Sequence, residues 1–116
     1  MKKLLIGLMV LFSVVFVNKV AIHRENVIYL DEDNQVFIKG ENRNGQLGDG
    51  SFDESDTFIN ITDNFDLAGS EFIKSVSLGE YHGAALSNTG RVFTWGHNAY
   101  GKLGVEPGSD ENMLME

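Results

Sequence analysis

The chain has 116 residues, a formal net charge of −8 and no cysteine. That length allows one small domain, and the missing thiols exclude disulfides, thiolate metal sites and cysteine nucleophiles. The acidity makes nucleic acid an unfavourable direct partner, because a negative surface repels the phosphate backbone.

The N-terminal segment 1–19 has the composition of a targeting segment. Lys2 and Lys3 precede an uncharged, mostly apolar run over residues 4–17. A helix of that length would extend about 21 Å, which is short of the roughly 30 Å apolar core of a bilayer. A basic start followed by a short apolar run is typical of a secretory signal. Residues 18–21 lack a good small-residue cleavage site, so an uncleaved anchor stays open, as does a buried core element.

We therefore predict that residues 1–19 form an apolar helix that serves as a signal peptide or membrane anchor. The expected location of the protein is extracytoplasmic, either secreted or anchored at the cell surface. Contact with a membrane is expected only through this segment.

The remainder of the chain repeats itself at an offset of fifty-six positions, which we call the repeat offset. Eight of the nineteen positions from Leu30 to Gly48 are identical to the position one repeat offset later. Four of the eight are glycine or asparagine, which have special backbone roles in turns. The identical pairs are Leu30 and Leu86, Val36 and Val92, Phe37 and Phe93, Gly40 and Gly96, Asn42 and Asn98, Gly45 and Gly101, Leu47 and Leu103, and Gly48 and Gly104.

The pattern inside each copy is that of a β-hairpin followed by a glycine-rich loop. Apolar and β-branched runs at 27–30 and 35–38 flank an Asp/Asn turn, and runs at 84–86 and 91–95 flank Ser-Asn-Thr-Gly. Asn34 stands where the second copy has Gly90, and both residue types tolerate positive φ. Further strands are predicted at 57–61 and 72–78. Four short strands in each repeat predict an all-β fold of antiparallel propeller blades.

The second copy also carries a specific motif. It reads Gly79-x-x-His82-x-x-Ala85-Leu86, then Gly90-x-Val92-x-x-Trp95-Gly96-x-Asn98-x-x-Gly101-x-Leu103-Gly104. This pattern resembles the repeat of the regulator of chromosome condensation family. The first copy matches best over Gly40-x-Asn42-x-x-Gly45-Gln46-Leu47-Gly48-x-Gly50, and it departs from the pattern where Lys39, Asn26 and His23 replace Trp95, His82 and Gly79. The first blade is therefore expected to be degenerate, as a frayed or capping unit would be.

The resemblance implies a seven-bladed ring whose members serve as protein-binding platforms. This chain would supply about two of the seven blades. We expect residues 20–56 to form a first, degenerate repeat, 57–106 a second repeat, and 107–116 the start of a truncated third. Because each blade needs neighbours to bury its faces, further blades are expected in the same or another chain. A truncated gene, a partial sequence and a unit completed by other chains all stay open.

The sequence assigns no catalytic, cofactor-binding or metal-binding residue, and it predicts a protein that is not an enzyme. His82 has no nucleophile or paired carboxylate at a recognisable spacing, so a structural hydrogen-bonding role is expected. The glycines lack phosphate-loop spacing, and the acidic runs at 31–34 and 49–56 lack the spacing of a calcium loop. Trp95 is predicted to pack between blades, and the alternative is an exposed binding hot spot.

The function predicted from these features is that of an exported propeller scaffold that binds a protein through its blade loops. A non-functional remnant of a larger multi-blade protein and an exchange factor for a small GTPase are the alternatives, because fold alone does not transfer function. The residues expected to define the repeat are structural: Gly40, Asn42, Gly45, Leu47, Gly48, Gly79, His82, Leu86, Gly90, Val92, Trp95, Gly96, Asn98, Gly101, Leu103 and Gly104.

Overall fold

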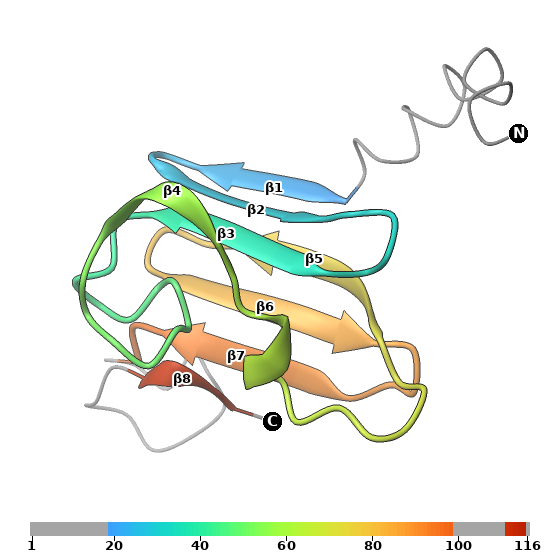
Figure 1. Ribbon diagram of the computed structural model, residues 1–116. Coiled ribbons are helices and arrows are strands. Elements are labelled where there is room, and N and C mark those ends of the chain that lie inside the picture. Colours follow the sequence, from blue (N-terminus) through green and yellow to red (C-terminus); the bar gives the residue numbers. More distant parts are fainter. Residues whose placement is uncertain (1–18, 99–110, 116) are drawn as a thin grey trace, which may run out of the picture.

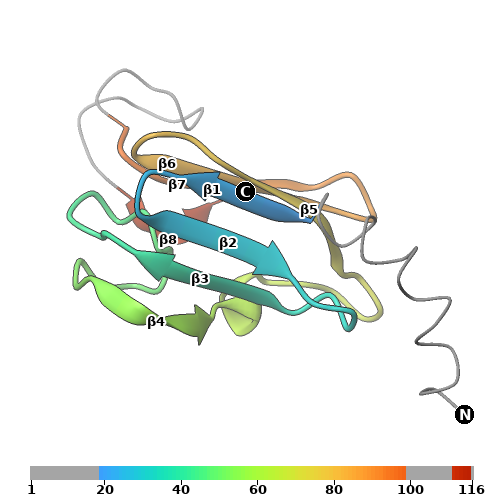
Figure 2. The ribbon, with the colours of Figure 1, turned by 90° about the horizontal axis from the view of Figure 1, so that it is seen from above.

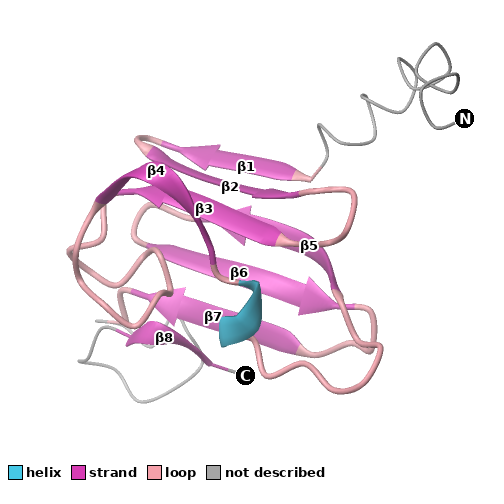
Figure 3. Ribbon diagram, in the orientation of Figure 1, coloured by secondary structure: helices cyan, strands magenta, loops and turns pink. Residues whose placement is uncertain are grey.

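The computed structural model describes residues 19–98 and the backbone of strand 111–115. The predicted N-terminal helix lies outside these residues. Within them the fold is all-β, with two four-stranded antiparallel sheets (Figure 1, Figure 3). The first sheet contains β1 (Val20–His23), β2 (Asn26–Leu30), β3 (Val36–Gly40) and β4 (Ser55–Asn60). The second contains β5 (Ile73–Leu78), β6 (His82–Ser87), β7 (Val92–Gly96) and β8 (Glu111–Met115).

The repeat offset extends to the pairing of the strands. Tyr29 pairs with Phe37 between β2 and β3, and the corresponding pair between β6 and β7 is Ala85 with Phe93. Gly40 pairs with Ser55, and one repeat offset later Gly96 pairs with Glu111. The two sheets are therefore structural repeats of each other.

The predicted hairpins are confirmed, and so is the chemistry of their turns. Asn34 has a φ of 58° and Gly90 has a φ of 92°, so both adopt the left-handed conformation that these residue types tolerate. Asp31 supports the first turn through its side chain, because its Oδ1 accepts hydrogen bonds from the backbone N–H groups of Asp33 and Gln35. This is the local bonding by which Asp stabilises turns.

The boundaries of the sheets fall later in the chain than the boundaries that the sequence predicts for the repeats. Strand β4 begins at Ser55 and pairs with β3, so the first sheet extends beyond the expected repeat boundary after residue 56. Strand β8 pairs with β7 and completes the second sheet, although its residues stand at the expected start of a third repeat. Each sheet thus takes its fourth strand from the start of the following sequence repeat.

The core lies between the two sheets. Alternate residues of β2 and β3 are buried, and they face the alternate buried residues of β6 and β7. The sheets lie closest at β1, β2 and β5 and diverge toward β4 (Figure 2). Leu47, Ile61 and Phe65 fill the wider part of this wedge, and Phe65 contacts the rings of Phe93 and Trp95 edge to face.

The connection between the sheets contains a short 3₁₀ helix, η2 (Thr62–Asn64). Within residues 19–98 and 111–115, no helix has the length and apolarity needed to span a bilayer.

Candidate functional site

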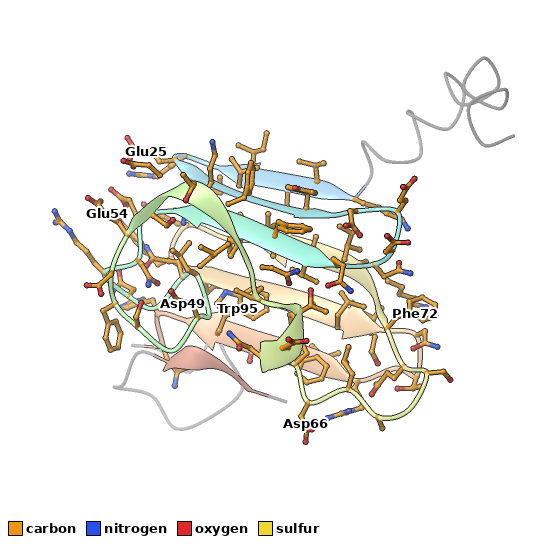
Figure 4. All side chains as sticks on the ribbon, viewed as in Figure 1. Glu25, Asp49, Glu54, Asp66, Phe72 and Trp95 are labelled. Carbon is orange, nitrogen blue, oxygen red and sulfur yellow. The ribbon has the colours of Figure 1, made fainter. Side chains whose placement is uncertain are left out.

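The two ends of the sheets differ in what they display. One end carries the turn at 24–25, the loop at 41–54 and the turn at 79–81; the other carries the turns at 31–35 and 88–91 and the connection at 61–72. Figure 4 places Glu25, Asp49 and Glu54 at the first of these ends and Asp66 and Phe72 away from it. We call the first end, formed by residues 24–25, 41–56 and 79–81, the acidic end.

The loop of the acidic end is built around Asn42, whose side chain is fully buried. Its Oδ1 accepts a hydrogen bond from the backbone N–H of Leu47 at 2.9 Å. Its Nδ2 donates to the carbonyl oxygens of Ser51 and Asp53 at 3.0 and 2.9 Å. One side chain therefore holds three points of the 41–54 loop, as expected for an asparagine that braces loop backbone.

Trp95 joins the two sheets. It is fully buried, and its indole Nε1 donates a hydrogen bond to the backbone oxygen of Gln46 at 2.6 Å. The indole lies against Gly83, where an added Cβ would clash with its six-membered ring. The prediction that Trp95 packs between blades is confirmed for these two sheets. The alternative, that Trp95 is an exposed binding hot spot, is wrong.

Gly40 and Gly96 allow close approach at the acidic end. Their φ values are 125° and 107°, in the region that favours glycine. A Cβ at Gly40 would lie 2.6 Å from the carbonyl oxygen of Glu25, and one at Gly96 would lie 2.7 Å from Cα of His82. The third strand of each sheet can therefore reach the preceding turn only because these positions lack a side chain.

His82 is half-buried, and its imidazole packs directly over Gly79, where an added Cβ would collide with the ring. Three other residues that were predicted to define the repeat lie in the loops that follow β3 and β7. Gly45 and Gly48 have positive φ in the 41–54 loop, and Asn98 is fully buried.

The remaining predicted residues fall into two groups. Leu86 and Val92 lie on the face of the second sheet that points away from the first, and Val92 is 51% exposed. Gly101, Leu103 and Gly104 lie outside the described residues.

At the acidic end, four carboxylate side chains and one lysine gather around a single groove. The groove is lined by Glu25, Lys39, Gly40, Glu41, Glu54, Ser55 and Asp56. Lys39, the cation among these lining residues, lies over the ring of Phe58, with 4.8 Å from Nζ to the ring centre. On the neighbouring turn, a hydrogen bond from Tyr81 to Glu80 and the charge of that carboxylate raise the pKa of Tyr81. Among residues 19–98, no three His or carboxylate side chains are arranged to hold a metal ion.

A cluster that the sequence did not predict lies at the opposite end, around Glu71. Its carboxylate accepts hydrogen bonds from Ser87 Oγ, Thr89 Oγ1 and the guanidinium of Arg91 at 2.6, 2.5 and 2.8 Å. The backbone N–H of Ala68 adds a fourth, at 3.0 Å. The pKa of Glu71 is lowered to about 2, mainly by the hydrogen bonds from the hydroxyl groups of Ser87 and Thr89. A carboxylate held ionised in this way is a structural acceptor and is unsuited to donate a proton in general acid chemistry.

Comparison with known proteins identifies the repeat. The profile of the "Regulator of chromosome condensation (RCC1) repeat" matches residues 73–102. The X-linked retinitis pigmentosa GTPase regulator of Mus musculus is 34% identical over 87 residues, which are 75% of this chain and 8% of that protein. The probable E3 ubiquitin-protein ligase HERC6 of Homo sapiens is 36% identical over 90 residues, 77% of this chain and 8% of that protein. The chain thus spans 8% of the length of these curated relatives.

Comparison of the fold with solved structures leads to the same family. The crystal structure of human WBSCR16 superposes with a TM-score of 0.72 at 28% sequence identity, over 83% of this chain and 25% of that one. Together with the paired sheets and the repeat offset between their registers, these matches show that the chain is a repeat protein of the regulator of chromosome condensation type.

Proposed function

We propose that this chain is part of an exported β-propeller scaffold that binds a protein partner through the loops of its acidic end. The observation that carries the proposal is the 41–54 loop, whose backbone is fixed from inside by Asn42 while Glu54 and Asp53 are exposed. A loop that is already ordered loses little entropy on binding, so its contacts contribute more fully to affinity.

The chemistry of this end favours a partner with a Lys- or Arg-rich surface. Glu25, Glu54 and Asp56 are exposed and line one groove. A patch of one sign steers a partner of the opposite sign and raises the association rate, in a manner that falls with ionic strength.

Charge reversal tests this proposal. The double variant Glu25→Lys and Glu54→Lys should lose the partners that the wild-type chain captures under native conditions at low salt. The matched control is the double variant Glu32→Lys and Asp33→Lys, which reverses two exposed charges in the turn at the opposite end. If the captured proteins are the same for all three chains, or if their capture does not weaken with added salt, the acidic end is not the binding surface.

We also propose that residues 1–19 direct export and that the protein works outside the cytoplasm. The support is the basic start and the apolar run over residues 4–17. Deletion of residues 1–19 should leave the product in the cytoplasm in a cell-fractionation experiment. Export of the deleted chain at the wild-type level would contradict this part of the proposal.

On this proposal the two sheets are blades of a larger, seven-bladed ring, and the protein acts by binding without catalysing a reaction. A remnant of a multi-blade protein is the second candidate. A third is exchange activity on a small GTPase, which one relative favours because its name is that of a GTPase regulator. Acceleration of nucleotide release from a purified small GTPase by this chain would establish the third candidate over binding alone.

A further inference from the structure

The chain enters its first sheet at the end opposite to the acidic end. Strand β1 begins at Val20, which pairs with Tyr29 of β2, and it runs from there to the turn at 24–25 of the acidic end. The backbone oxygen of Lys19 accepts a hydrogen bond from the N–H of Leu30 at 3.0 Å. Figure 1 shows the start of β1 on the same side as the turn between β2 and β3. Lys19 is therefore fixed at the end that lies farthest from the acidic end.

Very little chain separates this fixed point from the apolar segment. The apolar run covers residues 4–17, so residue 18 alone stands between the run and Lys19. A fully extended residue spans at most about 3.6 Å, so two residues span about 7 Å. If the apolar run is buried in a bilayer, the first sheet begins within about 7 Å of it, and the end that carries Lys19 is the end nearest to the lipid.

The charges beside the apolar run suit a segment that stays in a membrane. Lys2 and Lys3 precede the run and Lys19 follows it. A segment that is shorter than the apolar core of a bilayer is accommodated when long flanking side chains reach the headgroups, and lysine has such a side chain. Residues 18–21 also lack a good small-residue cleavage site.

We propose that residues 1–19 remain in the membrane and hold the two sheets upright, so that the acidic end is turned away from the lipid surface. This inference rests on the proposed export of the chain and adds an orientation to it. A partner with a Lys- or Arg-rich surface would then meet the protein on the side facing away from the membrane.

The end nearest to the lipid has no basic surface of its own that would bind anionic headgroups. Glu32 and Asp33 are exposed in the turn at 31–35, and Asp63 and Asp66 are exposed in the connection between the sheets. Negative side chains are repelled by anionic headgroups. Contact with the lipid is therefore left to the N-terminal segment, and the sheets are not drawn down onto the surface.

The acidic end lies about one strand length farther from the lipid. Strand β2 has five residues, which at 3.3–3.4 Å per residue span about 17 Å. Charges in solution are screened over about 8 Å at physiological ionic strength. The acidic end therefore lies beyond the reach of the headgroup charges, and its attraction for a basic partner does not depend on the composition of the lipid.

Single cysteines can measure this orientation in the full chain, because the protein has no cysteine of its own. Glu32→Cys carries a donor fluorophore at the end near the lipid, and Glu54→Cys carries the same fluorophore at the acidic end. Both positions are exposed glutamates, so the two variants are matched in charge and in accessibility. Asp33→Cys and Asp56→Cys form a second matched pair, also exposed. A pair is measured when both variants keep the wild-type circular dichroism spectrum.

The labelled chains are added to preformed phosphatidylcholine vesicles that contain a rhodamine-labelled lipid as energy acceptor. Energy transfer to the lipid should be more efficient from position 32 than from position 54, and more efficient from 33 than from 56. The difference should correspond to a distance from the lipid that is larger by roughly 17 Å at the acidic end, the length of a five-residue strand. Deletion of residues 1–19 should abolish transfer from every position.

Four outcomes would overturn the proposal. Equal transfer from the two ends, or greater transfer from the acidic end, contradicts the orientation. A full chain that does not bind the vesicles, transfer that survives deletion of residues 1–19, or a mature protein from cells that has lost these residues contradicts the anchor. Failed export would instead appear in cell fractionation, and failed partner binding in the charge-reversal experiment. Neither of these failures would change the transfer efficiencies.

Discussion

Trp95 gives the sharpest test of how the two sheets are held together. Replacing it by alanine removes a fully buried indole from between the sheets, and its hydrogen bond to the oxygen of Gln46. Large-to-small substitution of a buried Trp costs about 3–5 kcal/mol. Trp95→Phe keeps most of the packing but leaves the buried Gln46 oxygen without its donor, which costs about 1–3 kcal/mol. We therefore expect the order of stability wild type, Trp95→Phe, Trp95→Ala.

The assay is urea denaturation followed by far-ultraviolet circular dichroism, because both variants lack the tryptophan that a fluorescence assay would need. Val92→Ala serves as the control on the same strand, and its exposed side chain should change the free energy of unfolding by less than about 0.5 kcal/mol. If Trp95→Ala lies within about 1 kcal/mol of the wild type, well under the cost of emptying a buried site, the indole does not hold the sheets together and the reasoning fails.

Three further predictions concern single side chains. Asn42→Ala should lower the free energy of unfolding by about 2 kcal/mol in urea denaturation, because it leaves the buried N–H of Leu47 without its acceptor. A variant as stable as the wild type would contradict this. Glu71 has a pKa of about 2 in the folded chain against an ordinary 4.5, so it stabilises the fold above pH 4.5 and this contribution is lost as the pH falls toward 2. The unfolding midpoint of Glu71→Gln should therefore fall less over that range than the wild type does, and parallel curves would refute the assignment. Gly96→Ala should lower the free energy of unfolding by about 1–3 kcal/mol more than Gly90→Ala does. Both glycines have positive φ, but only at Gly96 would an added Cβ meet backbone atoms within contact distance. Equal losses of stability in the two variants would rule out this contact.

The strands and turns of this protein are largely determined by its sequence. The repeat offset predicts that the two sheets share one register, and pairs such as Tyr29 with Phe37 and Ala85 with Phe93 confirm it. Asn34 and Gly90 mark turns that need positive φ. Such features are local: they depend on backbone conformation, on alternation along a strand, and on side chains that bond to nearby backbone.

The sequence was less informative about how the repeats divide into sheets. A strand was predicted at 57–61, yet only the pairing of the observed β4 (Ser55–Asn60) with β3 shows that it completes the first sheet. The four donors of Glu71 are likewise invisible in the sequence, because they come from residues 68 and 87–91, which no motif connects to position 71.

Tertiary structure alone decided which face of each sheet is buried. Alternation gives every strand two faces, and in a blade that contacts a neighbour on one side only, both faces can be apolar. The choice is made by contacts between distant residues, of which Trp95 with Gln46, 49 positions apart, is the clearest. Composition, the repeat and the turn chemistry were set by the sequence. Which face of each sheet is buried and which is left open appears only once the sheets are stacked, because burial is a property of the pair of sheets and not of the pattern of either strand.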